Sequence, residues 1–166
     1  AQFIERALRR QGIEVLRNRH ILLRERRETL AIAGVDDYGY GADVNRALSG
    51  IPRNAATVLL AHNPRLVGLA ACHGVSLVLS GHTHGGQVNL PIFGTVYGRS
   101  PERLRFKIGW DRLGDTQIYV SRGIGTVVLP WRVRCPAEIP RLELECHQPE
   151  APRPQAQFRY PTAPQG

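Results

Sequence analysis

Three histidines stand at positions that suit a metal site. His82 and His84 lie two residues apart in the segment GHTHGG, and His62 follows the apolar run 57–61. Imidazole is the commonest metal-binding side chain at neutral pH. An H-x-H pair alone is a weak signal, but a third histidine directly after a buried strand favours metal binding more strongly. The glycines around the pair permit unusual backbone angles and the close approach of a ligand.

Two predicted strands carry these histidines towards one edge of a sheet. The continuous apolar runs 57–61 and 76–80 are typical of strands buried on both faces. Asn63 can cap a short helix between them, with Pro64 at its first position. Strands joined in this way are expected to lie parallel and adjacent, and sites in open α/β sheets gather where such strands end. The sequence therefore predicts that the three histidines meet in one region.

The rest of the pattern predicts an α/β fold in which helix and strand alternate first and strands dominate later. Apolar periodicity predicts a helix over about 2–11, stopped by Gly12, and a second helix beginning near Asp43, which can cap it. A proline-rich tail that is disordered or extended is expected over 147–166, and one domain over 1–146. Shorter runs predict further strands at 13–16, 21–23, 30–33, 103–110, 116–121 and 139–145, of which 21–23 and 30–33 form a hairpin.

Other residues with chemical side chains have simpler interpretations. Asp36 and Asp37 lie in a glycine-rich turn, where Asp side chains bond to nearby backbone amides. A ligating or orienting carboxylate is the alternative for these two. His20 and His147 fall outside the strand-end pattern and are expected to be structural or exposed, whereas His73 suits the C-terminus of a helix.

Composition narrows the function further. The sequence has 22 basic and 14 acidic residues, a net charge of +8 that would attract nucleic acid, phosphorylated substrates or acidic lipid. The basic residues are scattered and aromatic residues make up only 7%, so a nucleic-acid partner ranks last. The cysteines at 72, 135 and 146 have no paired spacing and are expected to be small buried side chains. No apolar run approaches the roughly 18 residues of a membrane span.

Two segments resemble motifs of a known family. LLAHNP (59–64) and LVLSGHTHGGQ (77–87) are similar to the last two metal-binding motifs of calcineurin-like metallophosphoesterases. LRNRHILL, IAGVDDYGYG, NLPIFG and YVSRGIGTVVLPWRVRCPAEIPRLEL extend the resemblance, to the bacterial YkuE- and YaeI-like subgroup, over about residues 1–146. The resemblance implies half of a four-layer α/β-β/α sandwich and hydrolysis of phosphate mono- or diesters by two divalent ions, Mn, Fe or Zn. It implies that His62 and His82 bind one ion and that His84 binds the other.

The family's remaining motifs, D-x-H, G-D-x-x-D and G-N-H-[DE], do not occur in this sequence. They supply an Asp and a His, a bridging Asp, an Asn and the His often assigned as general acid. The resemblance therefore implies a carboxyl-terminal half that is inactive alone, with the general acid and the bridging Asp upstream of Ala1. Its implied partners are a phosphate-ester substrate and the amino-terminal half of the same domain, and any membrane contact would run through that upstream segment.

Two questions stay open at this point. Arg99, Arg103 and Arg122 follow the histidine motif and could meet a phosphate, although ordinary surface arginines are the simpler interpretation. The alternative function is a non-enzymatic metal-binding module that uses the same three histidines.

Overall fold

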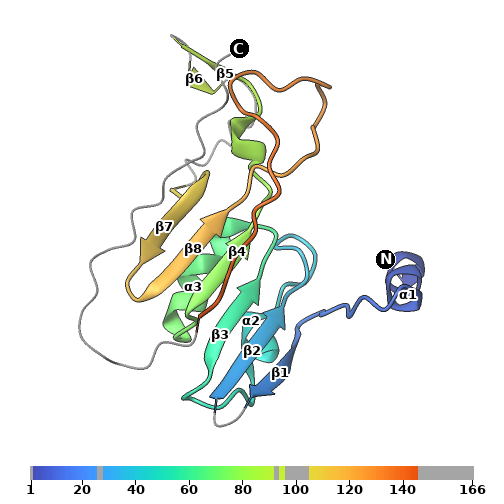
Figure 1. Cartoon of the computed structure of the whole chain (residues 1–166), viewed down its shortest axis with the longest axis vertical. Helices are drawn as coiled ribbons and strands as arrows, with labels where there is room; N and C mark the ends of the chain where they lie inside the picture. Colours follow the sequence, from blue (N-terminus) through green and yellow to red (C-terminus); the bar gives the residue numbers. More distant parts are fainter. Residues whose placement is uncertain (1, 26–27, 92–93, 96–104, 146–166) are drawn as a thin grey trace.

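The computed structural model describes residues 2–25, 28–91, 94–95 and 105–145 (Figure 1). Its main sheet consists of β1 (Arg19–Glu25), β2 (Glu28–Gly34), β3 (Ala56–Leu60), β4 (Leu77–Ser80), β7 (Gly109–Leu113) and β8 (Thr116–Val120). The strand order is β1-β2-β3-β4-β8-β7. The central strands β2, β3, β4 and β8 run parallel, and β1 and β7 are antiparallel edges. The predicted adjacent pair of parallel strands is confirmed as β3 and β4.

Helices α2 (Val44–Leu48) and α3 (Val67–Cys72) pack on one face of this sheet, whereas α1 (Gln2–Arg10) lies away from it (Figure 1). The α/β fold class is confirmed. In the described residues the architecture is one six-stranded sheet with one helical layer and a separate two-stranded sheet, so the second half of the expected sandwich stays a prediction. The core between sheet and helices consists mainly of Val44, Ala47, Leu59, Val67, Ala70, Val78, Ile118 and Val120.

Local sequence signals set the helix starts as predicted. The Asp43 side chain accepts a hydrogen bond from the Arg46 amide at 2.9 Å and caps α2. The Asn63 side chain accepts from the Arg65 amide at 3.1 Å and caps the 3₁₀ turn η1 (Pro64–Leu66), which runs into α3. These caps fix the connections that lead from β2 to β3 and from β3 to β4.

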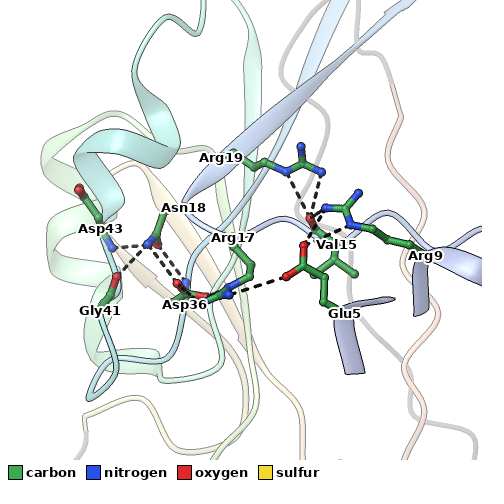
Figure 2. Close-up of polar contacts among 9 residues, drawn as sticks. All are labelled: Glu5, Arg9, Val15, Arg17, Asn18, Arg19, Asp36, Gly41 and Asp43. Atoms are coloured by element: carbon green, nitrogen blue, oxygen red, sulfur yellow. Dashed lines mark hydrogen bonds and ion pairs between the residues drawn. The ribbon is translucent and has the colours of Figure 1, made fainter. Parts of the chain in front are cut away.

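Asn18 joins the loop after β2 to the start of α2, as Figure 2 shows. Its Oδ1 accepts from the backbone amides of Asp36 and Asp43, both at 3.0 Å, and its Nδ2 donates to the Gly41 carbonyl at 2.8 Å. Arg17 adds a two-pronged ion pair with the Asp36 carboxylate. The loop that leaves the carboxyl end of β2 is therefore fixed by one short side chain, beside the strand end that carries His62.

Three strand predictions need correction. Residues 13–16 are not a strand, because the Val15 carbonyl is bound by the side chains of Arg9 and Arg19 instead of a neighbouring backbone. Residues 139–145 form no backbone ladder with a described strand, and Pro140 has no N–H to donate to one. The strand expected over 103–110 begins only at Gly109. The two-residue turn 114–115 sets the register of the β7–β8 hairpin, so that Gly109 pairs with the last residue of β8. Residues 103 and 104 lie outside the described part.

Other predicted elements of the fold are present in the structure. The hairpin of β1 and β2, the helix near the amino end and the strand at 116–121 are confirmed. No local pattern predicted the 3₁₀ turn η2 (His84–Gly86) or the short pair β5 (Asn89–Leu90) and β6 (Gly94–Thr95). The tail 147–166 lies outside the described residues, so the domain boundary at 146 stays a prediction. No helix in the described ranges is long and apolar enough to span a membrane.

Candidate metal centre

His62 and His82 meet at the carboxyl ends of β3 and β4. The ladder between these strands continues past their ends, because the Ala61 amide donates to Leu79 and the Gly81 amide donates to the His62 carbonyl at 3.1 Å. The loops that follow the two strands therefore leave the sheet side by side. The His62 Nε2 and the His82 Nδ1 are 3.4 Å apart, and the two rings stand edge to face at 84°.

The surroundings of His82 favour its neutral form. Partial burial of the ring lowers the pKa of His82, and the neighbouring imidazole of His62 lowers it further, against an opposing effect of the Asp37 carboxylate. Neutral imidazole is the form that binds a metal ion. The backbone of His82 is left-handed, with φ of 69°, which turns its side chain towards His62 immediately after Gly81.

His84 points to a different neighbour. Its Nδ1 lies 3.2 Å from the Gly125 carbonyl oxygen, in a loop that follows β8. In the described part of the chain, no three His, Cys, Asp or Glu side chains converge on one metal position. The structure therefore brings His62 and His82 together, while the His84 Nδ1 contacts Gly125 instead of the pair, an arrangement compatible with the prediction that His84 serves a second ion. The assignment of all three as ligands stays a prediction.

Gln87 anchors the loop that carries His84. Its side chain is 1% exposed. Its Nε2 donates to the carbonyls of Val127 and Leu129, and its Oε1 accepts from the Val127 amide at 2.7 Å. The thiol of Cys135, also buried, lies within hydrogen-bonding distance of the carbonyls of His84 and Gly85. The loop 81–87, called the histidine loop below, thus packs against the 121–138 segment through contacts between residues 40 or more positions apart in the sequence.

Arg122 is held by Glu138 rather than standing as an ordinary surface arginine. Its Nε donates to the Glu138 carboxylate at 2.8 Å, and the backbone amide of Arg122 and the Tyr119 hydroxyl donate to the same carboxylate. Burial opposes the charge on Glu138, but these hydrogen bonds outweigh it and lower the pKa of the carboxyl below its usual value. Glu138 thus binds the Nε and Nη2 of Arg122, which favours a structural role for this arginine over a phosphate contact. Arg99 and Arg103 lie outside the described residues.

The two carboxylates after β2 have different contacts. The Asp37 Oδ1 accepts from the Gly39 amide at 3.1 Å, which confirms the turn interpretation for Asp37. The same interpretation is wrong for Asp36, because its carboxylate accepts from the side chains of Arg17 and Asn18 and not from a nearby backbone amide. The charge of Asp37 opposes the lowering of the His82 pKa.

The remaining histidines and cysteines fall as follows. His20 is structural, since its Nδ1 lies 2.9 Å from the Ala47 carbonyl, and His73 ends α3 as predicted. Cys135 is buried as expected, but Cys72 is exposed, because it sits on the outer side of the last turn of α3. Cys146 and His147 lie outside the described residues.

Sequence reasoning missed Gln87, Cys135 and Glu138. Their partners lie 16 to 51 residues away, so no local spacing links them. The available signal was a glutamine directly after GHTHGG, a polar residue with no obvious helical or strand role. An open pocket beside His62 was equally invisible; it is lined by Leu60, Ala61, Leu79, Ser80, Gly81, Tyr119, Ser121, Pro140 and Leu142.

Comparison with known proteins decides the family. The zebrafish transmembrane protein with metallophosphoesterase domain is 35% identical over 152 residues, which is 83% of this chain. The uncharacterized metallophosphoesterase YkuE of Bacillus subtilis is 37% identical over 111 residues, 66% of this chain. The chain belongs to the calcineurin-like metallophosphoesterase family. Another member, the phosphodiesterase YaeI of Escherichia coli, is 30% identical over 141 residues, 85% of this chain.

This metallophosphoesterase chain spans only part of its relatives. The matched region covers 34% of the zebrafish protein, 38% of YkuE and 51% of YaeI. No family model matches the chain, and no solved structure matches it. Membership therefore rests on sequence identity to these whole proteins, together with the histidine pair that the fold assembles.

Proposed function

We propose that this chain forms part of the catalytic centre of a metal-dependent hydrolase that acts on phosphate mono- or diesters. The observation that carries the proposal is the pair His62 and His82, whose ring nitrogens lie 3.4 Å apart at the ends of adjacent parallel strands. The names of the relatives, metallophosphoesterase and phosphodiesterase, support the same reaction class. The net charge of +8 suits an anionic substrate.

The donor set fits divalent transition-metal ions. Imidazole suits Zn and Fe among other ions, and availability often decides which metal binds. In the proposal His62 and His82 hold one ion and His84 holds a second, with Mn, Fe or Zn as the candidate metals. Two bound cations would activate water and stabilise the attacking and leaving oxygens of a phosphate ester.

The residues of this chain orient the ligands. The hydrogen bond from the Gly81 amide to the His62 carbonyl keeps the segments that follow β3 and β4 side by side. The left-handed backbone of His82 directs its ring towards His62, and the nearby glycines leave the approach to the pair open. His62 and His82 are both exposed to solvent, so a substrate phosphate has access to them.

The proposal also includes ligands from residues outside this chain. The described residues hold no cluster of three acidic, histidine or cysteine ligands, and the sequence lacks the family's three aspartate- and asparagine-containing motifs. Without a carboxylate to bridge the ions and balance their charge, the 166-residue chain alone should show little or no hydrolysis. A bridging Asp and the general acid would come from an upstream part of the same domain.

Hydrolysis of bis(p-nitrophenyl) phosphate with added Mn²⁺ tests this function. The assay compares the 166-residue chain with a longer chain extended upstream along the encoding DNA, each as wild type and as His82→Ala. A matched control is His73→Ala, which removes an imidazole that bonds to Asn45 from the C-terminus of α3, before the amino end of β4 rather than at its carboxyl end. Activity confined to the longer chain, lost in His82→Ala and kept in His73→Ala, supports the proposal. A longer chain that binds its metal and remains silent favours the non-enzymatic metal-binding module.

A further inference from the structure

The guanidinium of Arg132 lies among backbone carbonyls of two loops. Its Nη2 donates to the carbonyls of Arg122, Gly123 and Gly125, at 2.7, 3.1 and 2.6 Å. Its Nη1 donates to the His84 carbonyl at 3.2 Å and to the Cys135 carbonyl at 3.3 Å. One side chain therefore joins the loop after β8 to the loop that carries His84.

One of these carbonyls also contacts the ring of His84. The Gly125 oxygen lies 3.2 Å from the His84 Nδ1 and 2.6 Å from the Arg132 Nη2. A carbonyl oxygen only accepts hydrogen bonds, so the His84 Nδ1 must carry the proton in the neutral ring. The lone pair is then on Nε2. Metal-binding histidines usually donate their other ring N–H in this way, which fixes the tautomer and the ring orientation.

We propose that Arg132 is a positioning residue that holds the Gly125 carbonyl against His84 and so presents the His84 Nε2 as a metal ligand. This inference rests on the proposed function, because the metal role of His84 belongs to it. Arg132 touches neither metal nor substrate. It acts through Gly125 on the ring of His84 and through the His84 carbonyl on the backbone of the same residue.

The contacts of Arg132 favour this role over that of an ordinary ion pair. None of the carboxylates in the described ranges pairs with its guanidinium, and its buried Nε has no hydrogen-bond partner there. A partly buried charge without a carboxylate is costly to keep. Its five carbonyl contacts instead fix the relative positions of backbone segments, for which the flat guanidinium with five donors is suited and a lysine ammonium is not.

The tautomer of His84 can be measured without any metal. Long-range ¹H–¹⁵N correlation spectra of the chelator-treated 166-residue chain, labelled at histidine and recorded at pH 8, distinguish a proton on Nδ1 from one on Nε2. His84→Ala identifies the resonance. Arg132→Lys is compared with Arg134→Lys, a matched control that keeps the same charge two residues away, on a side chain that is exposed.

The wild type and Arg134→Lys should show His84 protonated at Nδ1, and Arg132→Lys should lose that preference. In a Zn²⁺ titration of the longer chain carrying the same substitutions, the affinity measured at the His84 Nε2 should fall about 10–100-fold in Arg132→Lys alone. If Arg132→Lys fails to fold, Arg132→Gln takes its place. A proton on Nε2 in the wild type, or equal spectra for the two lysine variants, would overturn the proposal. Because the tautomer does not depend on hydrolysis, a failure of the proposed function would be visible separately.

Discussion

Gly85, in the loop 81–87 that carries His84, is a position where a single added methyl group should be costly. Its φ is 61°, a left-handed conformation that costs a residue with a Cβ about 1–2 kcal/mol. A Cβ at this position would lie 2.6 Å from the Arg122 Cγ and 2.7 Å from the Cys135 Sγ. Neither neighbour can easily move, because Arg122 is bound to Glu138 and Cys135 is buried with its thiol against the loop carbonyls. Overpacking of this kind adds about 1–3 kcal/mol.

The expected loss of unfolding free energy in Gly85→Ala is therefore about 2–5 kcal/mol, the sum of the backbone and packing costs. Gly74→Ala is the matched control. Gly74 has a φ of 70°, and nothing lies within 4 Å of its added Cβ, so only the backbone cost of about 1–2 kcal/mol applies. The difference between the two variants isolates the packing of the histidine loop against the 121–138 segment.

Urea unfolding of the two variants and the wild type, followed by circular dichroism, measures both losses. Cys135→Ala should recover part of the loss in a Gly85→Ala background, a coupling on the order of 0.5–3 kcal/mol for residues in contact. Equal losses in Gly85→Ala and Gly74→Ala, with no coupling to Cys135, would refute the reasoning, because the loop would then not be packed as described.

Three further perturbations test the network around the site. Glu138→Gln should lower the free energy of unfolding by its full amount at pH 7. Because the folded pKa of Glu138 lies below its usual value, this difference from wild type should shrink as pH falls below about 4.3 and vanish below the lowered pKa. Urea unfolding at a series of pH values measures the difference. Gln87→Ala should expose the amide of Val127 to solvent, so that its hydrogen exchange accelerates while amides of β4 keep their protection. Asn18→Ala and Asn18→Gly should both lower the free energy of unfolding by about 1–3 kcal/mol, since the glycine relieves the positive φ but restores none of the hydrogen bonds. An unchanged free energy of unfolding in Asn18→Gly would show that the side chain is dispensable.

The parts of the fold that the sequence predicted are those with local causes. The buried runs that became β3 and β4 needed no partner to be identified, and the caps Asp43 and Asn63 act within three residues. The histidine pair followed from the adjacency of those two strands. The strand expected over 139–145 is wrong: its apolar alternation is real, but Pro140 interrupts the run of backbone donors and the segment pairs with no described strand.

The positioning of the site could not be predicted, because it depends on contacts between distant residues. Arg132 reaches the His84 carbonyl across 48 positions, and Gln87 reaches Val127 across 40. Nothing in the type or spacing of these residues distinguishes them from other arginines and glutamines. Only the folded arrangement shows that the charge of Arg132 is directed at backbone carbonyls beside His84.

The central claim is that His62 and His82 bind the same ion, and a double-mutant cycle tests it most directly. Mn²⁺-dependent hydrolysis of bis(p-nitrophenyl) phosphate would be measured in the longer chain for His62→Ala, His82→Ala and the double variant. Ligands of one ion act as a unit, so each single change should lower kcat about as far as both together. Additive losses, or activity retained in either single variant, would contradict the account.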